Sequence, residues 1–329
     1  MQKENLIIIG AGLCGLYSAY LLEKKYNVTI LEARDRIGGR VFGIEGHDLG
    51  PSWIWPHNTR MLELVETLGL KLLPQYTKGA ALYDVSEGVQ RFDAPPSMPS
   101  FRVEGGLSVL IDALYNKLKH TKLKLNHQVL SIQQKEKALH VKTNQGEFIA
   151  DKVICTLPPR LANSLIKYEP KLEQTTSEIL QSVPTWMGYA TKCVIEYENA
   201  FWKDKGLSGF VFSYLGPMSE IHDASTANHA ALFGFLHVRA KPNKKAIDKQ
   251  LKRLFGEVGV TYTNMYIHDW KEEVFSSSKE DARGLRTHPD YGFSFSHFDG
   301  QLIFSGTESS FQDGGYLEGA LNAALSINI

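Results

Sequence analysis

Four residues near the start of the chain have the types and spacing that bind a dinucleotide. Gly10, Gly12 and Gly15 form a G-x-G-x-x-G pattern, and Glu32 follows a second apolar run. The first glycine permits a tight turn, the second lets the backbone approach a pyrophosphate, and the third lets a helix pack closely on a strand. An acid at the position of Glu32 accepts hydrogen bonds from ribose hydroxyls. The segment therefore predicts a dinucleotide site; the alternative is an ordinary glycine-rich turn.

The segment that follows carries further chemistry for a pyrophosphate. Residues 32–40 read EARDRIGGR, in which a glycine pair is flanked by Arg34, Arg36 and Arg40. Such a pair lets the loop fold back over the pyrophosphate, where Arg40 can neutralise it by a bidentate contact. Nicotinamide enzymes do not usually extend the motif in this way. The alternative interpretation of the three arginines is a solvated basic turn.

Two residues far from this motif could act on a substrate. Lys192 lies in the apolar segment 191–197 (TKCVIEY), and burial of a lysine is costly unless it faces a cavity. The alternative is a surface lysine on the polar face of a half-exposed strand. Tyr316 has an electron-rich ring that can contact a cation through its face or pack against an apolar group. The alternative for Tyr316 is a core residue in the first turn of a helix.

Alternating strands and helices position these residues. Residues 6–9 and 27–31 are typical of strands buried on both faces of a parallel sheet, with a helix over residues 13–25 between them. The N-terminus of that helix offers free N–H groups and the positive end of its dipole to the phosphates. Residues 301–308 predict another strand, and a helix starts near residue 316. We therefore predict an α/β fold built on a doubly wound, Rossmann-like domain.

The middle of the chain predicts a second domain. The chain has 329 residues, which is roughly the length of two domains. We assign residues 1–70, 101–165 and 286–329 to a discontinuous dinucleotide-binding domain, and residues 71–100 and 166–285 to an α+β substrate domain.

Composition excludes several other classes of protein. Lys plus Arg and Asp plus Glu each number 36, so the chain has no net charge to attract nucleic acid or an anionic membrane. The basic stretches 117–124 and 241–253 are interpreted as solvated helix faces. The 3 cysteines include no C-x-x-C pair, which argues against a disulfide framework and a cysteine zinc site and favours a reducing, cytoplasmic compartment. The uncharged stretch 6–22 is short for a membrane span. We predict no metal, no nucleic-acid partner and no membrane partner.

Several stretches resemble the flavin amine oxidase family, which includes the monoamine and polyamine oxidases and the bacterial amino-acid oxidases. The resemblance is carried by the stretch 32–40, the loop 47–56 (HDLGPSWIWP), the helix opening at 101–106 and the closing segments 301–308 and 314–320. It implies FAD as the cofactor and a GR2-type version of the Rossmann-like domain.

The resemblance assigns cofactor roles to individual residues. Glu308 would bind the ribityl chain, the loop around Trp53 would pass beside the flavin ring, and the backbone at Val129 would contact the adenine. The helix start around Tyr316 would direct its dipole at N1 and O2 of the flavin, which stabilises the anionic reduced form. Together, the motif and the resemblance predict FAD contacts from Gly10, Gly12, Leu13, Cys14, Gly15, Glu32, Ala33, Arg34, Gly39, Arg40, Pro51, Ser52, Trp53, Val129, Gly306, Glu308, Gly315, Tyr316 and Leu317.

The resemblance also implies three catalytic residues. Lys192 would lie beside flavin N5, hold a water and assist reoxidation by oxygen. Tyr316 would form one wall of an aromatic cage, and Trp270 would lie near the flavin ring. The second wall of the cage is unassigned, with Tyr291 and Phe293 as candidates.

Two departures from the family pattern matter. Several members attach the flavin to a cysteine a few residues beyond the position of Trp270, whereas residues 271–291 contain no cysteine, so we expect non-covalent FAD. The interval from Gly50 to Glu104 is much shorter than in the larger amine oxidases. Most of their substrate-domain insertion is therefore missing, and their pocket walls cannot be transferred to this chain.

The function that we expect is an FAD-dependent oxidation of a small-molecule amine. An uncharged amine would lose hydride from its α-carbon to flavin N5, water would hydrolyse the imine, and O2 would reoxidise the flavin to give H2O2. One alternative is a carbon–carbon desaturase or porphyrinogen-type oxidase on the same scaffold. Another is a flavin-holding scaffold with a vestigial active site, which the short substrate domain favours.

Overall fold

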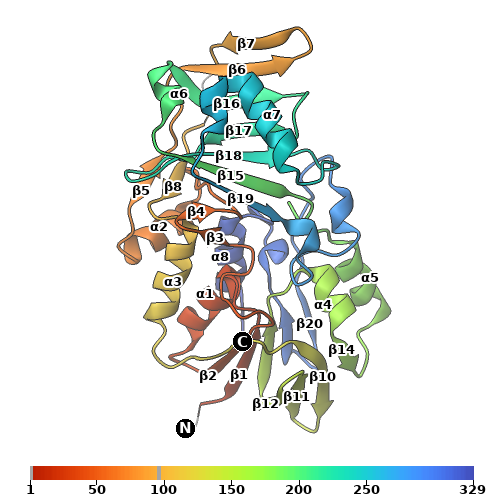
Figure 1. Ribbon diagram of the computed structural model, residues 1–329. Coiled ribbons are helices and arrows are strands. Elements are labelled where there is room, and N and C mark those ends of the chain that lie inside the picture. Colours follow the sequence, from red (N-terminus) through yellow and green to blue (C-terminus); the bar gives the residue numbers. More distant parts are fainter. Residues whose placement is uncertain (1–2, 95–97) are drawn as a thin grey trace.

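The computed structural model describes residues 3–94 and 98–329, and the chain forms two halves, each centred on a large sheet (Figure 1). The lower sheet has six strands in the order β20-β21-β13-β1-β2-β9. All of its pairings are parallel except that of β20 with β21. Its strands are β1 (Asn5–Ile9), β2 (Asn27–Leu31), β9 (Lys122–Lys124), β13 (Lys152–Cys155), β20 (Phe295–His297) and β21 (Leu302–Phe304).

Both faces of the lower sheet are covered, which explains the continuous apolar run of β1. Leu6 and Ile8 pack against helices on one face, and Ile7 and Ile9 pack against a second sheet on the other. The helices are α1 (Leu13–Leu22), α3 (Leu107–Lys117) and α8 (Leu317–Leu325). The second sheet has the order β12-β11-β10-β14, with β10 (Val129–Lys135), β11 (Ala138–Thr143), β12 (Gly146–Ala150) and β14 (Lys167–Glu169). The predicted Rossmann-like α/β domain is therefore confirmed, with this sheet as its third layer.

The upper sheet has seven strands in the order β19-β15-β18-β17-β16-β6-β7 (Figure 1). Strand β15, which pairs with β18 and β19, alternates between two environments. Cys193 and Ile195 join the core beneath helix α7, whereas Val194 packs with Leu49 of the lower half. The elements are β6 (Ala80–Val85), β7 (Gly88–Phe92), β15 (Thr191–Tyr197), β16 (Leu207–Ser213), β17 (Met218–Asp223), β18 (Ala230–Leu236), β19 (Asn264–Asp269) and α7 (Lys244–Phe255).

Short elements connect the two large sheets. A hairpin of β3 and β4 reaches toward β15, and a two-stranded sheet of β5 and β8 links the segment before α3 to the upper half. These and the remaining elements are β3 (Gly43–Ile44), β4 (His47–Asp48), β5 (Leu72–Pro74), β8 (Phe101–Val103), α2 (Thr59–Thr67), α4 (Pro159–Leu165), α5 (Gln174–Ser182), α6 (Phe201–Asp204) and four 3₁₀ turns at Glu257–Val260, Trp270–Glu272, Asp281–Arg283 and Thr307–Ser309.

The sheet pairings support the proposed division into two domains. Apart from residues 95–97, which lie outside the described residues, both segments assigned to the substrate domain contribute to the upper sheet. Strand β14 and helix α5 are exceptions, because both follow residue 165 but belong to the lower half: β14 pairs with β10, and Leu180 of α5 packs in the core beneath the lower sheet. We therefore propose a boundary after residue 182.

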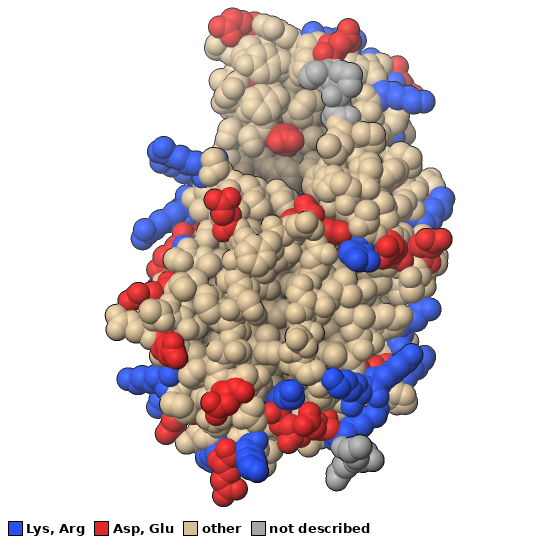
Figure 2. Space-filling view, turned by 180° about the vertical axis from the view of Figure 1, so that it is seen from behind, with Lys and Arg blue, Asp and Glu red and all other residues tan. Residues whose placement is uncertain are grey.

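The surface carries charges of both signs. Helix α7 buries Ile247 and Leu251 and leaves most of its lysines in solvent, as the sequence predicts for the stretch 241–253. Figure 2 shows Lys and Arg interspersed with Asp and Glu over the face opposite to that of Figure 1. Over residues 3–94 and 98–329, no helix combines the length and the apolar character needed to cross a bilayer.

The glycines of the first turn predict contrasting effects on folding. A Cβ atom at Gly15 would lie 2.0 Å from the carbonyl oxygen of Gly10, whereas one at Gly12 meets nothing nearer than 3.9 Å. Gly15→Ala should therefore lower the free energy of unfolding by about 1–3 kcal/mol despite alanine's better helix propensity.

Urea unfolding of flavin-free protein measures this difference, with Gly12→Ala as the matched control. We expect the control to unfold like the parent but to bind FAD more weakly, because its methyl group occupies space left for the pyrophosphate. Equal stability of Gly15→Ala and the parent would contradict the close helix–strand contact.

Candidate active site

One cavity of about 600 Å³ connects the glycine turn to the underside of the upper sheet. Its lower end is lined by Gly10, Gly12 and Glu32, at the carboxyl ends of β1 and β2. Its upper end is lined by Lys192 and Tyr316. Of the predicted cofactor contacts, the cavity walls include Gly10, Gly12, Leu13, Cys14, Glu32, Ala33, Arg34, Gly39, Arg40, Pro51, Ser52, Trp53, Val129, Gly315, Tyr316 and Leu317. Gly15, Gly306 and Glu308 are not in that lining.

The Glu32 carboxylate is held rigidly at the lower end of the cavity. Its two oxygens accept hydrogen bonds from the backbone N–H groups of Ala11, at 2.8 Å, and Arg34, at 2.9 Å. A carboxylate oxygen retains a further lone pair after one such bond, which leaves Glu32 able to accept from ribose hydroxyls. The guanidinium group of Arg34 binds Glu273 and Ser276, each at 2.8 Å, so it links the two halves.

Arg40 and Glu308 form an ion pair between the two ends of the chain. Arg40 donates to both carboxylate oxygens of Glu308, at 2.5 and 3.2 Å, and Glu308 is fully buried. The sequence resemblance assigned these residues to the pyrophosphate and the ribityl chain, respectively. The direct pairing was not predicted, because nothing in the local sequence shows that residues so far apart meet.

Lys192 is a buried lysine beneath the upper sheet, with only 1% of its surface exposed. Its Nζ atom donates to the Gly50 carbonyl oxygen at 3.0 Å and to the Ser52 hydroxyl at 2.5 Å. The same atom lies 4.2 Å from the centre of the Phe233 ring. Burial lowers the pKa of Lys192 to about 7, although the charge of Asp48 acts in the opposite direction. The side chain faces the cavity, as the cost of burying it predicts.

Asp48 is a charge partner that the sequence analysis did not assign. It immediately precedes the loop that contacts Lys192, and its Oδ1 atom accepts a hydrogen bond from the N–H of Leu107 at 2.7 Å. Burial raises the pKa of Asp48 to about 6, while the nearby charges of Lys192 and Arg102 lower it. Asp48 and Lys192 therefore influence each other's protonation, and the apolar strand around Lys192 gave no sign of this partner.

Aromatic side chains line the cavity near the start of α8, among them Tyr316, Trp55 and Trp186. The Tyr316 ring stacks on His288, with ring centres 4.9 Å apart and planes at 4°. The ring centres of Trp55 and Trp186 lie 6.0 and 6.4 Å, respectively, from the ring centre of Tyr316. Trp186 lines the cavity, and sequence reasoning missed it because it lies in a loop without periodicity.

The two candidates for the second cage wall do not line this cavity. The Tyr291 hydroxyl donates to the carbonyl oxygen of Pro184 at 2.7 Å. Phe293 packs against the core between the lower sheet and its neighbouring sheet. We therefore propose Trp186 in place of either residue.

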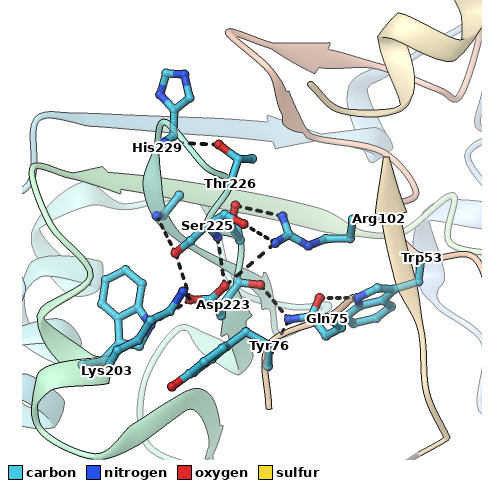
Figure 3. Close-up of polar contacts among 12 residues, drawn as sticks. Trp53, Gln75, Tyr76, Arg102, Lys203, Asp223, Ser225, Thr226 and His229 are labelled. Atoms are coloured by element: carbon cyan, nitrogen blue, oxygen red, sulfur yellow. Dashed lines mark hydrogen bonds and ion pairs between the residues drawn. The ribbon is translucent and has the colours of Figure 1, made fainter. Parts of the chain in front are cut away.

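A polar network fixes the loop beneath Lys192 (Figure 3). The Trp53 indole donates to Gln75 at 2.9 Å, and Gln75 donates to the carbonyl oxygen of Asp223 at 2.8 Å. Arg102 donates to the carbonyl oxygens of Ala224 and Ser225 at 2.8 and 2.5 Å. This network ties the loop and strand β8 to the turn between β17 and β18.

Trp270 supports the other side of the same loop. Its indole N–H donates to the carbonyl oxygen of Leu49 at 2.9 Å, and its ring lines the cavity. Trp270 therefore lies between the loop and the cavity, and its place near the flavin ring stays a prediction. Cys14 also lines the cavity, but burial raises the pKa of its thiol to about 12, so it is not a reactive thiolate.

Comparisons with known proteins show which family this chain resembles. A family profile described as flavin containing amine oxidoreductase matches residues 89–326, and one described as NAD(P)-binding Rossmann-like domain matches residues 8–68. The chain is 25% identical to flavin-containing amine oxidase A of Equus caballus, over 97% of this chain and 83% of that protein. It is 23% identical to a probable flavin-containing monoamine oxidase A of Dictyostelium discoideum, over 98% and 96%. The alignment with the horse protein spans 444 positions, so that relative carries segments that this 329-residue chain lacks.

Solved structures with the same fold include two amine oxidases. A putrescine oxidase bound to putrescine superposes with a TM-score of 0.80 at 19% identity, covering 98% of this chain and 97% of that one. Cyclohexylamine oxidase from Brevibacterium oxydans gives the same TM-score, identity and coverage. A putative protoporphyrinogen oxidase from Exiguobacterium gives 0.72 at 14% identity, with 98% and 97% covered.

The chain belongs to the flavin-containing amine oxidoreductase family. It is an FAD-dependent oxidoreductase that acts on amines, as the sequence predicted. The residues present fit FAD, because the backbone at Gly12 is open to the cavity and the Glu32 carboxylate is fixed at the cavity wall, where it could accept hydrogen bonds from a ribose. The cavity also continues without a break from this turn to Lys192.

The Arg40–Glu308 pair predicts coupled effects on stability. Arg40→Met should lower the free energy of unfolding by about 3–5 kcal/mol, because it leaves a buried carboxylate without its cation. Arg40→Met combined with Glu308→Gln should lose less than the sum of the single changes, by about 1–3 kcal/mol. Urea unfolding of the four proteins measures this coupling, and additive losses would contradict the pair.

The lowered pKa of Lys192 predicts a pH-dependent stability. Between about pH 7 and pH 10.5 the unfolded chain binds a proton that the folded protein lacks, so the free energy of unfolding rises with pH. The stability of the parent relative to Lys192→Met should therefore increase across this window. Urea titrations at several pH values test the trend, with the exposed Lys249→Met as the control. If the difference in the free energy of unfolding between the parent and Lys192→Met stayed constant with pH, the lowered pKa of Lys192 would be contradicted.

Proposed function

We propose that this enzyme oxidises a small amine in its uncharged form. The main support for this proposal is that one cavity joins the glycine turn, the buried Lys192 and the aromatic side chains around Tyr316. When bound, FAD supplies the redox chemistry, in which N5 accepts hydride from the α-carbon of the amine and O2 restores the oxidised cofactor with formation of H2O2. Water hydrolyses the resulting imine to a carbonyl product and ammonia or a smaller amine.

The aromatic side chains select and orient the amine. The rings of Tyr316 and Trp186 present apolar faces that favour entry of a neutral amine, which is the form that carries a lone pair. Such walls also exclude water from the reacting carbon. No dedicated base is required in this proposal, because the amine loses its proton to solvent before it binds.

Lys192 acts in the proposal as a hydrogen-bond donor at the flavin-facing side of the cavity. Its Nζ atom is fixed by Gly50 and Ser52, and its remaining donor capacity is available to a water or to oxygen. The lowered pKa lets this group hold or release a proton near neutral pH. We further propose that FAD is bound without a covalent link, since residues 271–291 contain no cysteine.

The desaturase alternative receives some support from the fold shared with the putative protoporphyrinogen oxidase. That fold is shared equally with amine oxidases, so it does not favour an apolar substrate. The vestigial-scaffold alternative is disfavoured because a costly buried lysine is retained beside an open cavity.

Anaerobic reduction of the bound flavin tests the proposed function directly. We expect bleaching of the visible flavin absorption by at least one member of a panel of monoamines, diamines and polyamines, and H2O2 on readmission of air. The rate should rise with pH until the free amine is deprotonated. Reduction by no amine would favour the alternatives.

Lys192→Met tests the role of the buried lysine. It should slow reoxidation of the reduced enzyme by O2 on the order of tenfold or more, which corresponds to about 1.4 kcal/mol in the barrier. FAD affinity and anaerobic reduction should change much less. Stopped-flow mixing with oxygenated buffer measures the rate, and Lys249→Met serves as the control. Equal reoxidation rates in variant and parent would remove Lys192 from this role.

A further inference from the structure

Three potential metal ligands meet outside the cavity, at the contact between the two halves. His47 comes from β4, Glu196 from β15 and His229 from the turn before β18. One ligand atom from each side chain lies within 4.8 Å of the other two. His229 Nδ1 is 2.7 Å and His47 Nε2 is 3.7 Å from Glu196 Oε1. The sequence gave no sign of this cluster, because its members are far apart in the chain.

The His47 side chain lacks the hydrogen bond that a buried imidazole normally makes. It is 97% buried, and its Nε2 atom has no hydrogen-bond partner among residues 3–94 and 98–329. A buried polar atom without a partner costs about 1–3 kcal/mol. This atom points at the Glu196 carboxylate from just beyond hydrogen-bond distance, which leaves room for a bridging ion.

Hydrogen bonds also fix the Glu196 side chain and the turn that carries His229. Asn264 donates to Glu196 Oε2 at 2.9 Å, which leaves Oε1 directed at both histidines. The backbone N–H of His229 donates to the Thr226 hydroxyl at 3.1 Å, which fixes the turn (Figure 3). In Figure 3 the His229 ring points away from the Arg102–Asp223 network. In metal sites, hydrogen bonds to the ligand residues fix the orientation of the atoms that bind the metal.

Two imidazoles and one carboxylate form a donor set that suits a divalent transition metal. Zinc at about 2.0–2.1 Å from tetrahedral ligands places neighbouring ligand atoms roughly 3.3 Å apart. The observed separations, from 2.7 to at most 4.8 Å, span that value, so small side-chain rotations complete the site. His229 is exposed and gives an ion access from solvent.

We propose that His47, Glu196 and His229 bind one divalent metal ion of the zinc class, with water as the fourth ligand. The ion clamps the hairpin β3–β4 of the lower half to strands β15 and β18 of the upper sheet. His47 directly precedes Asp48, and Glu196 lies on the same face of β15 as Lys192. The clamp therefore stabilises the two segments that hold the proposed catalytic lysine.

Zinc binding to the FAD-loaded full chain tests this proposal. After chelator treatment and dialysis, titration calorimetry with ZnCl2 should show one site, and the bound zinc should raise the Tm. His229→Ala and Glu196→Gln should each weaken zinc binding at least about tenfold, since each removes one ligand. Both residues are at least partly accessible to solvent, so these variants should fold.

His140→Ala is the matched control. His140 forms a surface pair with Glu147 at 2.6 Å, which resembles the His229–Glu196 contact but includes no third ligand. This control should bind zinc like the parent. As a second readout, Co2+ should give the intense visible bands of a tetrahedral site in the parent and lose them in His229→Ala. Absence of zinc binding to the parent, or equal affinity in all variants, would overturn the proposal.

Discussion

The parallel pairing of β1 with β13, and of β13 with β21, is the constraint on which the rest of the molecule depends. It places the ends of strands from the start, middle and end of the chain at one edge of the lower sheet. The glycine turn after β1 and the start of α8 after β21 consequently face the same cavity. The Arg40–Glu308 ion pair then joins the two ends across that edge. A single cofactor can be held from both ends of the chain because the sheet brings them together.

The upper sheet closes this cavity with a residue that is expensive to bury. Lys192 points down from β15 onto the loop 49–53, and that loop is held by Trp270 on one side and by the Trp53–Gln75 network on the other. Hydrogen bonds and the nearby Asp48 carboxylate offset only part of the free energy needed to bury an ammonium group, so the pKa of Lys192 stays below its ordinary value. Position, burial and charge thus make one lysine of the upper sheet part of the cavity wall.

Much of the lower half could be predicted from local sequence because its signals are local. One strand–helix–strand unit contains the apolar run of β1, the three glycines and Glu32. Each of these features predicts the dinucleotide site for a separate physical reason. The helix α1 ends at Leu22, earlier than predicted, because the chain turns at residues 23–26 into β2. Strand β17 (MSEIHD) was missed because only Met218 and Ile221 are apolar, and its pairing with β16 and β18 decides its conformation.

The features that sequence could not reveal depend on contacts between distant segments. Trp186 lies in an irregular loop. The charge of Asp48 interacts with that of Lys192, which lies on a strand of the other half. His47 meets Glu196 only because β4 lies beside β15. No spacing rule connects such residues. The roles that the family resemblance assigns to residues follow neither from local sequence nor from contacts between segments, because they depend on where the flavin lies in the cavity.

The most direct test of the account is the flavin content of the purified protein. We predict a yellow protein that contains one FAD per chain, released into the supernatant when the protein is precipitated with acid. A colourless protein that takes up no FAD on reconstitution would contradict the claim that the two ends of the chain hold this cofactor. Flavin that remains in the precipitate would contradict its non-covalent attachment.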